Sequence, residues 1–278
     1  MPGNSPARRL LKRALYPLLS DSAYQFLQCL AMAWDIRSGK LREPEVDLLP
    51  YAVQPGETAL DIGANYGLYC FHLSHAVGRA GRVYAFEPIP FTFGTLRLVA
   101  RVLRLRNVQL VDKGCSDRNG ESTFTLPLQS TGALSAGQAH IIGRNDDRDG
   151  RERHARYDHA REVVCPIVRV DDFLVGDEDI SFVKCDIEGS ELLAMRGAVR
   201  TIDRCSPTVL CEINPWFLEG FGIDLGDLLH FFGERGYQLY RYDDHAHSLR
   251  PTQAADVNED NYMFIHARRR DRFRALLT

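Results

Sequence analysis

The chain has 278 residues, of which 45% are hydrophobic and 26% are charged, and 34 Lys and Arg side chains against 37 Asp and Glu give a net charge of -3. This apolar content can offset the entropy of ordering the chain, which excludes a largely disordered protein. The slightly acidic balance disfavours a nucleic-acid binder. The length allows one or two domains.

The cysteines indicate a reducing compartment. There are seven, an odd number, without a C-x-x-C pair, and several lie within apolar runs. We therefore expect reduced core residues and a cytoplasmic protein, with neither disulfides nor a zinc site. The N-terminal apolar region is interrupted by Pro17, Asp21 and Gln25, so it lacks the run of about 18 apolar residues that a membrane span requires.

The first predicted elements form a helical extension over residues 1–54. Apolar side chains recur at helical spacing before and after Pro17. We expect these helices to pack on the main domain or to cover a substrate pocket. Residues 1–20 carry four basic and no acidic side chains, and residues 267–278 carry five Arg and one Asp. These basic ends could make peripheral contact with an anionic membrane surface.

Short apolar runs then alternate with helical stretches through a predicted catalytic domain, 55–267, which a basic tail, 268–278, follows. Predicted strands lie at 58–62, 82–86, 108–111, 180–185 and 208–213. Predicted helices lie at 68–77, 91–105, 190–202 and 225–235. This alternation indicates parallel strands with right-handed crossovers, and hence a doubly wound α/β sheet.

Two further regions complete the predicted architecture. The last strands, 237–242 and 262–266, have a short connection and are expected to form an antiparallel edge hairpin. Between the two halves of the sheet, 122–126 and 163–170 are predicted strands, and 143–161 is predicted to be a solvated loop.

The strongest local signal lies where the first strand meets the first helix, in Asp61-Ile62-Gly63-Ala64-Asn65-Tyr66-Gly67. Glycines there let the backbone approach a ligand, and the helix N-terminus offers unpaired N–H groups. The G-x-x-x-G spacing differs from the G-x-G-x-x-G of dinucleotide sites. With Asp61 before the turn, the loop favours a positively charged cofactor that carries an amino-acid group.

A second cofactor signal closes the next strand. Glu87 ends it and Pro88 turns the chain. An acidic side chain at this place can accept hydrogen bonds from both hydroxyls of a ribose. Together with the glycine loop, Glu87 predicts a cofactor that contains a nucleoside.

Three carboxylates, Asp186, Glu188 and Glu212, follow or end later strands and are candidates for a general base, without a ranking. If the strand that begins at 180 continues to Glu188, then Asp186 and Glu188 lie on one face. Glu188 could instead cap the next helix. The same oxygens could hold Mg²⁺, which we do not favour, and no metal site is predicted. The histidines at 245 and 247 are expected in a polar loop.

Three separated segments, L-D-I-G-A-N-Y-G-L-Y, G-R-V-Y-A-F-E-P-I-P and V-K-C-D-I-E-G-S-E-L-L-A-M-R-G-A, resemble the FkbM family of S-adenosylmethionine-dependent methyltransferases. The resemblance runs in order from about residue 58 to 214. It implies the class I methyltransferase fold, a Rossmann-like sheet of seven strands whose last strand is antiparallel. It also implies S-adenosylmethionine (SAM) as the cofactor.

The resemblance also implies roles for individual residues. The methionyl part of SAM would lie among Asp61, Gly63, Ala64, Asn65 and Gly67, with Asp186 beside it. The ribose would lie at Glu87 and Pro88, and the adenine would be bordered by Asp112, Lys113 and Gly114. Here Gly114-Cys115-Ser116 departs from the Ala-Leu-Ser common in the family.

The sequence therefore predicts an O-methyltransferase that acts on a hydroxyl of a sugar, glycolipid or secondary metabolite by in-line transfer. The expected partner is a small-molecule or glycan acceptor, with no nucleic acid. Two alternatives remain: an NAD-dependent oxidoreductase, which shares the strand, glycine and acid pattern, and a non-catalytic module that binds membranes through its basic ends.

Overall fold

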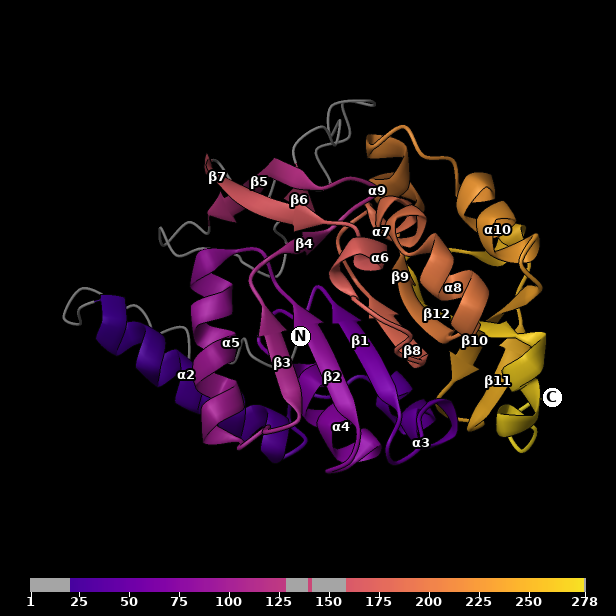
Figure 1. Ribbon diagram of the computed structural model, residues 1–278, viewed down its shortest axis with the longest axis horizontal. Helices are drawn as coiled ribbons and strands as arrows, with labels where there is room; N and C mark the ends of the chain where they lie inside the picture. The colour runs from indigo at the N-terminus through magenta and orange to yellow at the C-terminus, as the bar shows by residue number, and fades with distance from the viewer. Residues whose placement is uncertain (1–20, 129–139, 142–158, 278) are drawn as a thin grey trace.

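The computed structural model describes residues 21–128, 140–141 and 159–277, which form a large sheet covered by helices and a smaller sheet beside its carboxyl edge (Figure 1). The strands of the large sheet are β1 (Thr58–Ile62), β2 (Arg82–Phe86), β3 (Val108–Val111), β8 (Ile180–Cys185), β9 (Thr208–Ile213), β10 (Tyr237–Asp243), β11 (Ser248–Pro251) and β12 (Asp260–His266). The strands of the smaller sheet are β4 (Gly114–Cys115), β5 (Gly120–Leu128), β6 (His140–Ile141) and β7 (His159–Val168).

Helices connect these strands. They are α2 (Asp21–Arg37), α3 (Leu49–Ala52), α4 (Leu68–Val77), α5 (Pro90–Val102), α6 (Val170–Phe173), α7 (Glu191–Gly197), α8 (Val199–Cys205), α9 (Pro215–Gly220) and α10 (Leu225–Gly233), with 3-10 turns η2 (Pro44–Leu48), η4 (Ala254–Asp256) and η5 (Ala267–Phe273). None of the helices in the described part of the chain is long and apolar enough to cross a membrane.

The large sheet confirms the predicted doubly wound fold. Its order is β11-β10-β12-β9-β8-β1-β2-β3, and β12 pairs antiparallel with β9. The predicted antiparallel pairing of the last long strands is found between β10 and β12. The sheet has eight strands where seven were expected, because the short β11 pairs with β10 and forms the edge.

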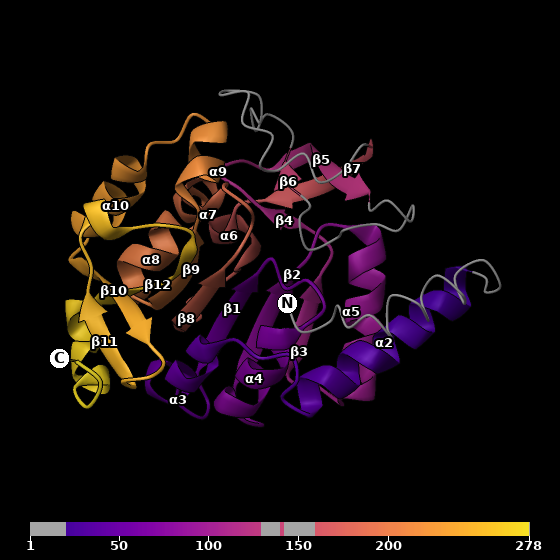
Figure 2. The same cartoon turned by 180° about the vertical axis from the view of Figure 1, so that it is seen from behind.

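The sheet is buried on both faces, so its central strands are apolar at consecutive positions. All six residues of β8 are buried. Leu60 and Val183 pack with α7, α8 and α10 on the face toward the viewer in Figure 1. Ala59 and Phe182 pack with α3 and α4 on the opposite face, seen from behind in Figure 2. The seven cysteines are all free and buried, as predicted for core residues.

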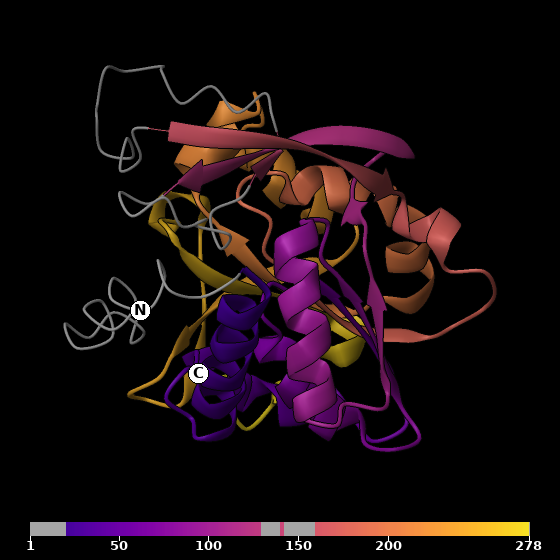
Figure 3. The same ribbon diagram turned by 90° about the vertical axis from the view of Figure 1, so that its left-hand side faces the viewer.

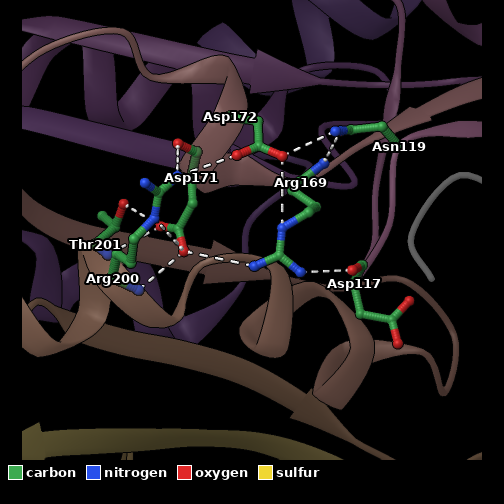
Figure 4. Close-up of polar contacts among 7 residues, drawn as sticks. All are labelled: Asp117, Asn119, Arg169, Asp171, Asp172, Arg200 and Thr201. Atoms are coloured by element: carbon green, nitrogen blue, oxygen red, sulfur yellow. Dashed lines mark hydrogen bonds and ion pairs between the residues drawn. The ribbon is translucent and has the colours of Figure 1, made fainter.

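The helix predicted over 190–202 is two helices, α7 and α8. At the junction, a Cβ on Gly197 would lie 1.9 Å from the backbone oxygen of Ser116, so the chain passes too close to β4 for a side chain there. The first turn of α8 is capped from outside the helix. Asp171 accepts hydrogen bonds from the backbone N–H of Arg200 at 2.9 Å and of Thr201 at 2.9 Å (Figure 4).

The same polar cluster fastens the smaller sheet to the body (Figure 4). Arg169, which follows β7, donates to the backbone oxygen of Asp117 at 2.6 Å. Asn119 donates to Asp172 at 2.8 Å and accepts from the backbone N–H of Arg169 at 2.8 Å. These hydrogen bonds therefore join segments 114–120 and 169–174, which are distant in the sequence.

Replacing Asp171 with alanine is expected to lower the free energy of unfolding by about 3 kcal/mol, because it leaves two N–H groups of α8 and the Thr201 hydroxyl without their buried acceptor. Urea unfolding followed by circular dichroism measures the loss. The exposed Asp177→Ala is the matched control and should change stability by less than about 0.5 kcal/mol. Equal stability of the two variants would contradict the capping role.

The basic tail departs in part from expectation, because two of its arginines and one aromatic residue contact the body of the protein. In the tail, Arg272 pairs with Glu57 and donates to it at 2.6 Å, while Arg269 donates to the backbone oxygen of Ser206 at 2.7 Å. Phe273 is fully buried in the core.

Much of the loop predicted at 143–161 lies outside the described residues, but β7 begins at His159, within that loop.

Candidate active site

The carboxyl ends of five neighbouring parallel strands, in the order β9-β8-β1-β2-β3, bring the predicted site residues to one edge of the sheet (Figure 1). Asp61 lies in β1, opposite Lys184 of β8, and Glu212 lies in β9, opposite Asn261 of β12. The N–H of Asp186 donates to the backbone oxygen of Ile62 at 3.0 Å, so β8 follows β1 for one residue beyond its end. In an open α/β sheet this edge is where ligands bind.

In the glycine loop after β1, neighbouring residues leave almost no space for a side chain at Gly63 or Gly67. Gly63 has a φ of +83°, and a Cβ there would lie 1.9 Å from the backbone oxygen of Asp186. Gly67 has a φ of +91°, and a Cβ there would lie 2.8 Å from Leu96. The N–H groups of Gly63 and Ala64 both donate to the oxygen of Phe86. Glycine is therefore required at both positions by conformation and by contact.

Glu87 ties this loop to the end of β2. One carboxylate oxygen accepts the N–H of Asn65 at 3.0 Å and the other accepts the N–H of Ile89 at 3.0 Å. Burial raises the pKa of Glu87 to about 7. Asn65 itself has a φ of +48°, and its buried Oδ1 has no hydrogen-bond partner among the described residues. A buried acceptor without a partner in this loop calls for an explanation, and a hydrogen bond from a bound ligand would supply one.

Asp61 lies beneath the loop rather than on its surface. Its side chain is buried and accepts a hydrogen bond from the Cys70 thiol at 3.1 Å. Burial raises the pKa of Asp61 to about 6. Direct contact between Asp61 and a cofactor remains a prediction.

Asp186 and Glu212 form a hydrogen-bonded carboxyl pair next to the Lys184 ammonium. The Lys184 Nζ lies 3.2 Å from Asp186 Oδ2. Burial opposes ionisation of Asp186, but Lys184 and the hydrogen bond from Glu212 outweigh it and lower the Asp186 pKa. Burial and the Asp186 charge raise the pKa of Glu212 far above its ordinary value. Asp186 is therefore the carboxylate of the pair, and Glu212 is protonated and donates to it.

A polar network behind this pair was missed in the sequence. Lys184 Nζ also donates to Asn261 Oδ1 at 3.0 Å and lies 5.1 Å from the centre of the Tyr69 ring. Glu43, which precedes η2, accepts from the Tyr69 hydroxyl at 2.8 Å and from the Asn261 amide at 3.4 Å. One signal was present: Lys184 stands inside an otherwise apolar strand, where a lysine is expected to be paired.

The condition for placing Glu188 by strand alternation, a strand that continues to this residue, is not met. β8 ends at Cys185, and Glu188 has a left-handed φ of +58° in the turn before α7. Glu191 shapes this turn, because its Oε1 accepts the N–H of Ile187 at 3.1 Å and the N–H of Gly189 at 3.0 Å. The side chain of Glu188 is half-buried.

The residues predicted at the adenine lie where β3 leads into β4. Asp112 is exposed, Lys113 is half-buried, and Gly114 is buried in β4. A Cβ on Gly114 would lie 3.6 Å from Pro88, so the ends of β2 and β3 come close together here. Their roles in cofactor binding stay predictions.

One group of potential metal ligands is found within the described residues, away from these strand ends. Asp47, Asp244 and His247 place one ligand atom each within 4.8 Å of the others. Arg42 forms an ion pair with Asp47, so a protein cation already lies at this cluster. At the sheet edge the Lys184 ammonium takes the place beside Asp186 that a metal would need.

Comparisons with known proteins bear on this arrangement. The model of the methyltransferase FkbM domain matches residues 61–239. The AMB antimetabolite synthetase AmbE of Pseudomonas aeruginosa is 31% identical over 166 residues, a match that covers 51% of this chain and 8% of that protein.

Two solved structures are also similar. The methyltransferase FkbM from Methylobacillus flagellatus KT has a TM-score of 0.46 and 18% identity over 93% of this chain and 59% of that chain. A TehB-like SAM-dependent methyltransferase from Corynebacterium glutamicum has a TM-score of 0.45 and 12% identity over 88% of this chain and 100% of that chain. Because the family model covers more than half of the sequence, the chain belongs to the FkbM methyltransferase domain family.

Proposed function

We propose that the protein transfers a methyl group from SAM to a hydroxyl of a small-molecule or glycan acceptor, with Asp186 as the general base. One observation carries the assignment of the base. Lys184 and Glu212 hold Asp186 as a carboxylate at the carboxyl edge of the sheet, directly against the glycine loop. The family assignment argues against the dinucleotide-dependent oxidoreductase.

The residues at the edge fit SAM in charge and hydrogen bonding. The Oδ1 of Asn65, which has no partner among the described residues, is our candidate acceptor for an ammonium group. Glu87 is placed to accept from ribose hydroxyls, as acidic residues at this strand end do in nucleotide folds. When bound, SAM supplies a methyl group activated by a sulfonium. The protein then has to align the acceptor oxygen and take its proton.

The three candidate bases are no longer equal. Glu212 is protonated and already donates to Asp186, so it cannot take up a further proton from a hydroxyl at neutral pH. Asp186 is ionised, and its side chain is 33% exposed at the edge. A hydroxyl that hydrogen-bonds to Asp186 can pass its proton to that carboxylate as the new bond forms. We assign Glu188 no step in the reaction.

The acceptor class follows from the family resemblance, which favours a sugar, a glycolipid or a secondary metabolite. The similarity to a segment of an antimetabolite synthetase supports the last of these. Incubation with SAM and a panel of hydroxylated acceptors, read by release of S-adenosylhomocysteine, tests the reaction. We expect turnover to persist in EDTA, because Lys184 already provides the cation beside Asp186.

Glu87→Gln is expected to weaken SAM binding about tenfold to a hundredfold at pH 8, since the amide places a donor where two N–H groups and the ribose need an acceptor. In the wild type, SAM affinity should fall as the pH drops through about 7, because Glu87 becomes protonated there. The variant should lose this pH dependence.

Titration calorimetry with SAM and S-adenosylhomocysteine measures both effects. The exposed Asp227→Ala, on α10 far from β2, is the control and should bind as the wild type does (Figure 1). If the folded wild type binds neither compound, the proposed cofactor is wrong.

A further inference from the structure

Helix α2 is apolar on two faces, and only one of them is covered. Its inner face packs Cys29, Ala33 and Ile36 against Val99 of α5. Its outer face leaves four large apolar side chains in solvent: Phe26 at 51% exposure, Leu27 at 45%, Leu30 at 40% and Trp34 at 63%. A helix that is apolar all round is normally buried in protein or in contact with lipid.

These four side chains, here named the α2 stripe, form one surface. Leu27, Leu30 and Trp34 follow the i, i+3, i+7 spacing of a single helix face. In the described part of the chain seven large apolar side chains are exposed, and four of them belong to the α2 stripe. Such a concentration marks an interaction site, whereas isolated exposed apolar residues do not.

The exposed charges next to the α2 stripe are mostly basic. Helices α2 and α5 lie side by side on one outer face of the molecule (Figure 3). Over residues 26–42 and 90–107 the only acidic side chain is Asp35, which is buried. Apart from Arg42, which is ion-paired with Asp47, the exposed charged residues of these segments are Arg37, Lys40, Arg97, Arg101, Arg104 and Arg106, here named the basic rim.

We propose that the α2 stripe and the basic rim dock this protein on an anionic membrane surface. Trp, Phe and Leu side chains flanked by Arg and Lys suit the boundary between headgroups and acyl chains. Each basic side chain near a surface of anionic lipids adds attraction that falls off within a Debye length.

A second copy of the chain fits this face less well. A two-fold dimer would set one basic rim against an identical one, and facing like charges oppose association. A membrane surface supplies the opposite charge and the apolar layer together. This inference extends beyond methyl transfer and does not depend on it.

Co-sedimentation of the full chain with vesicles tests the proposal. Vesicles of phosphatidylcholine with about one third phosphatidylglycerol are expected to bind the protein, and pure phosphatidylcholine vesicles are not. The double variant Leu30→Ser, Trp34→Ser should bind at least about tenfold more weakly, because two large apolar side chains no longer enter the interface. The double variant Arg101→Glu, Arg104→Glu should bind the anionic vesicles more weakly, and its binding should depend less on the salt concentration.

The matched control is the double variant Val164→Ser, Val175→Ser, which removes exposed apolar side chains away from α2 and should bind as the wild type does. Thermal unfolding checks that all variants are folded. Unchanged vesicle binding after loss of Leu30 and Trp34 would overturn the proposal. So would a wild type that ignores anionic vesicles, and sedimentation that detects a dimer lost in the same variant would assign the face to a second copy instead.

Discussion

Asp186→Asn is expected to lower kcat about a thousandfold while SAM affinity stays within about threefold of the wild-type value. The amide keeps the shape of the side chain and can still accept the hydrogen bond from Glu212. It cannot take a proton from an acceptor hydroxyl. The loss therefore falls on the chemical step, and calorimetry together with release of S-adenosylhomocysteine separates the two quantities.

Glu212→Gln is the matched control for this experiment. The glutamine amide can donate to Asp186 as the protonated carboxyl does, so the Asp186 carboxylate is preserved. We expect kcat within about tenfold of the wild type. If Glu212→Gln were the inactive variant and Asp186→Asn the active one, the base would be Glu212. Equal loss of SAM binding in both would place the pair in the cofactor site.

The main sheet and the cofactor loop could be predicted because their signals are local. Strands buried on both faces are apolar at consecutive positions, and Gly63 and Gly67 are fixed by the geometry of one short turn. The structure places Glu87 against this turn through the N–H of Asn65, so the two motifs that predicted a nucleoside-containing cofactor are physically joined.

The features that escaped prediction depend on contacts between distant segments. Gly197 and Asp171 divide a continuous helical pattern because β4 and α6 approach from elsewhere in the chain. Glu188 lies in a left-handed turn, which no period-two pattern can indicate. Apolar periodicity locates secondary structure well, but it does not reveal which polar groups meet between elements.

The network around Lys184 is the clearest case, since it joins β8 to Glu43 of the N-terminal segment and to Asn261 of β12. Spacing in the sequence gives no reason to associate residues 43, 184 and 261. Their meeting ties Glu43 of the expected N-terminal extension to the residues behind the candidate site. It also decides which carboxylate of the Asp186 and Glu212 pair keeps the proton.

Lys184→Met is expected to move the acid limb of the kcat profile to higher pH by about one to two units. The ammonium lowers the Asp186 pKa in the wild type, so Asp186 is ionised well below neutral pH. Without the ammonium the Asp186 pKa rises, and the base is protonated at pH values where the wild type is active. Turnover should therefore fall at mildly acidic pH, where the wild type is still active, and should return to the wild-type pH response at pH 7 and above.

Lys184→Met should also lower the free energy of unfolding. A lowered pKa in the folded state means that ionised Asp186 stabilises the fold above its unfolded pKa, and that this contribution is lost as the pH falls through the folded pKa. Removing the buried cation removes its part of that contribution and leaves the Asp186 carboxylate without its counter-ion, at a cost of about 3 kcal/mol.

Tyr69→Phe separates the two effects. It removes the hydroxyl that donates to Glu43 but keeps the ring beneath Lys184 and the contact between Lys184 and Asp186. Its acid limb should therefore coincide with that of the wild type even if its melting temperature falls. If Lys184→Met also lost stability without moving the acid limb, Lys184 would be a structural residue only, and Asp186 would owe its charge to other groups.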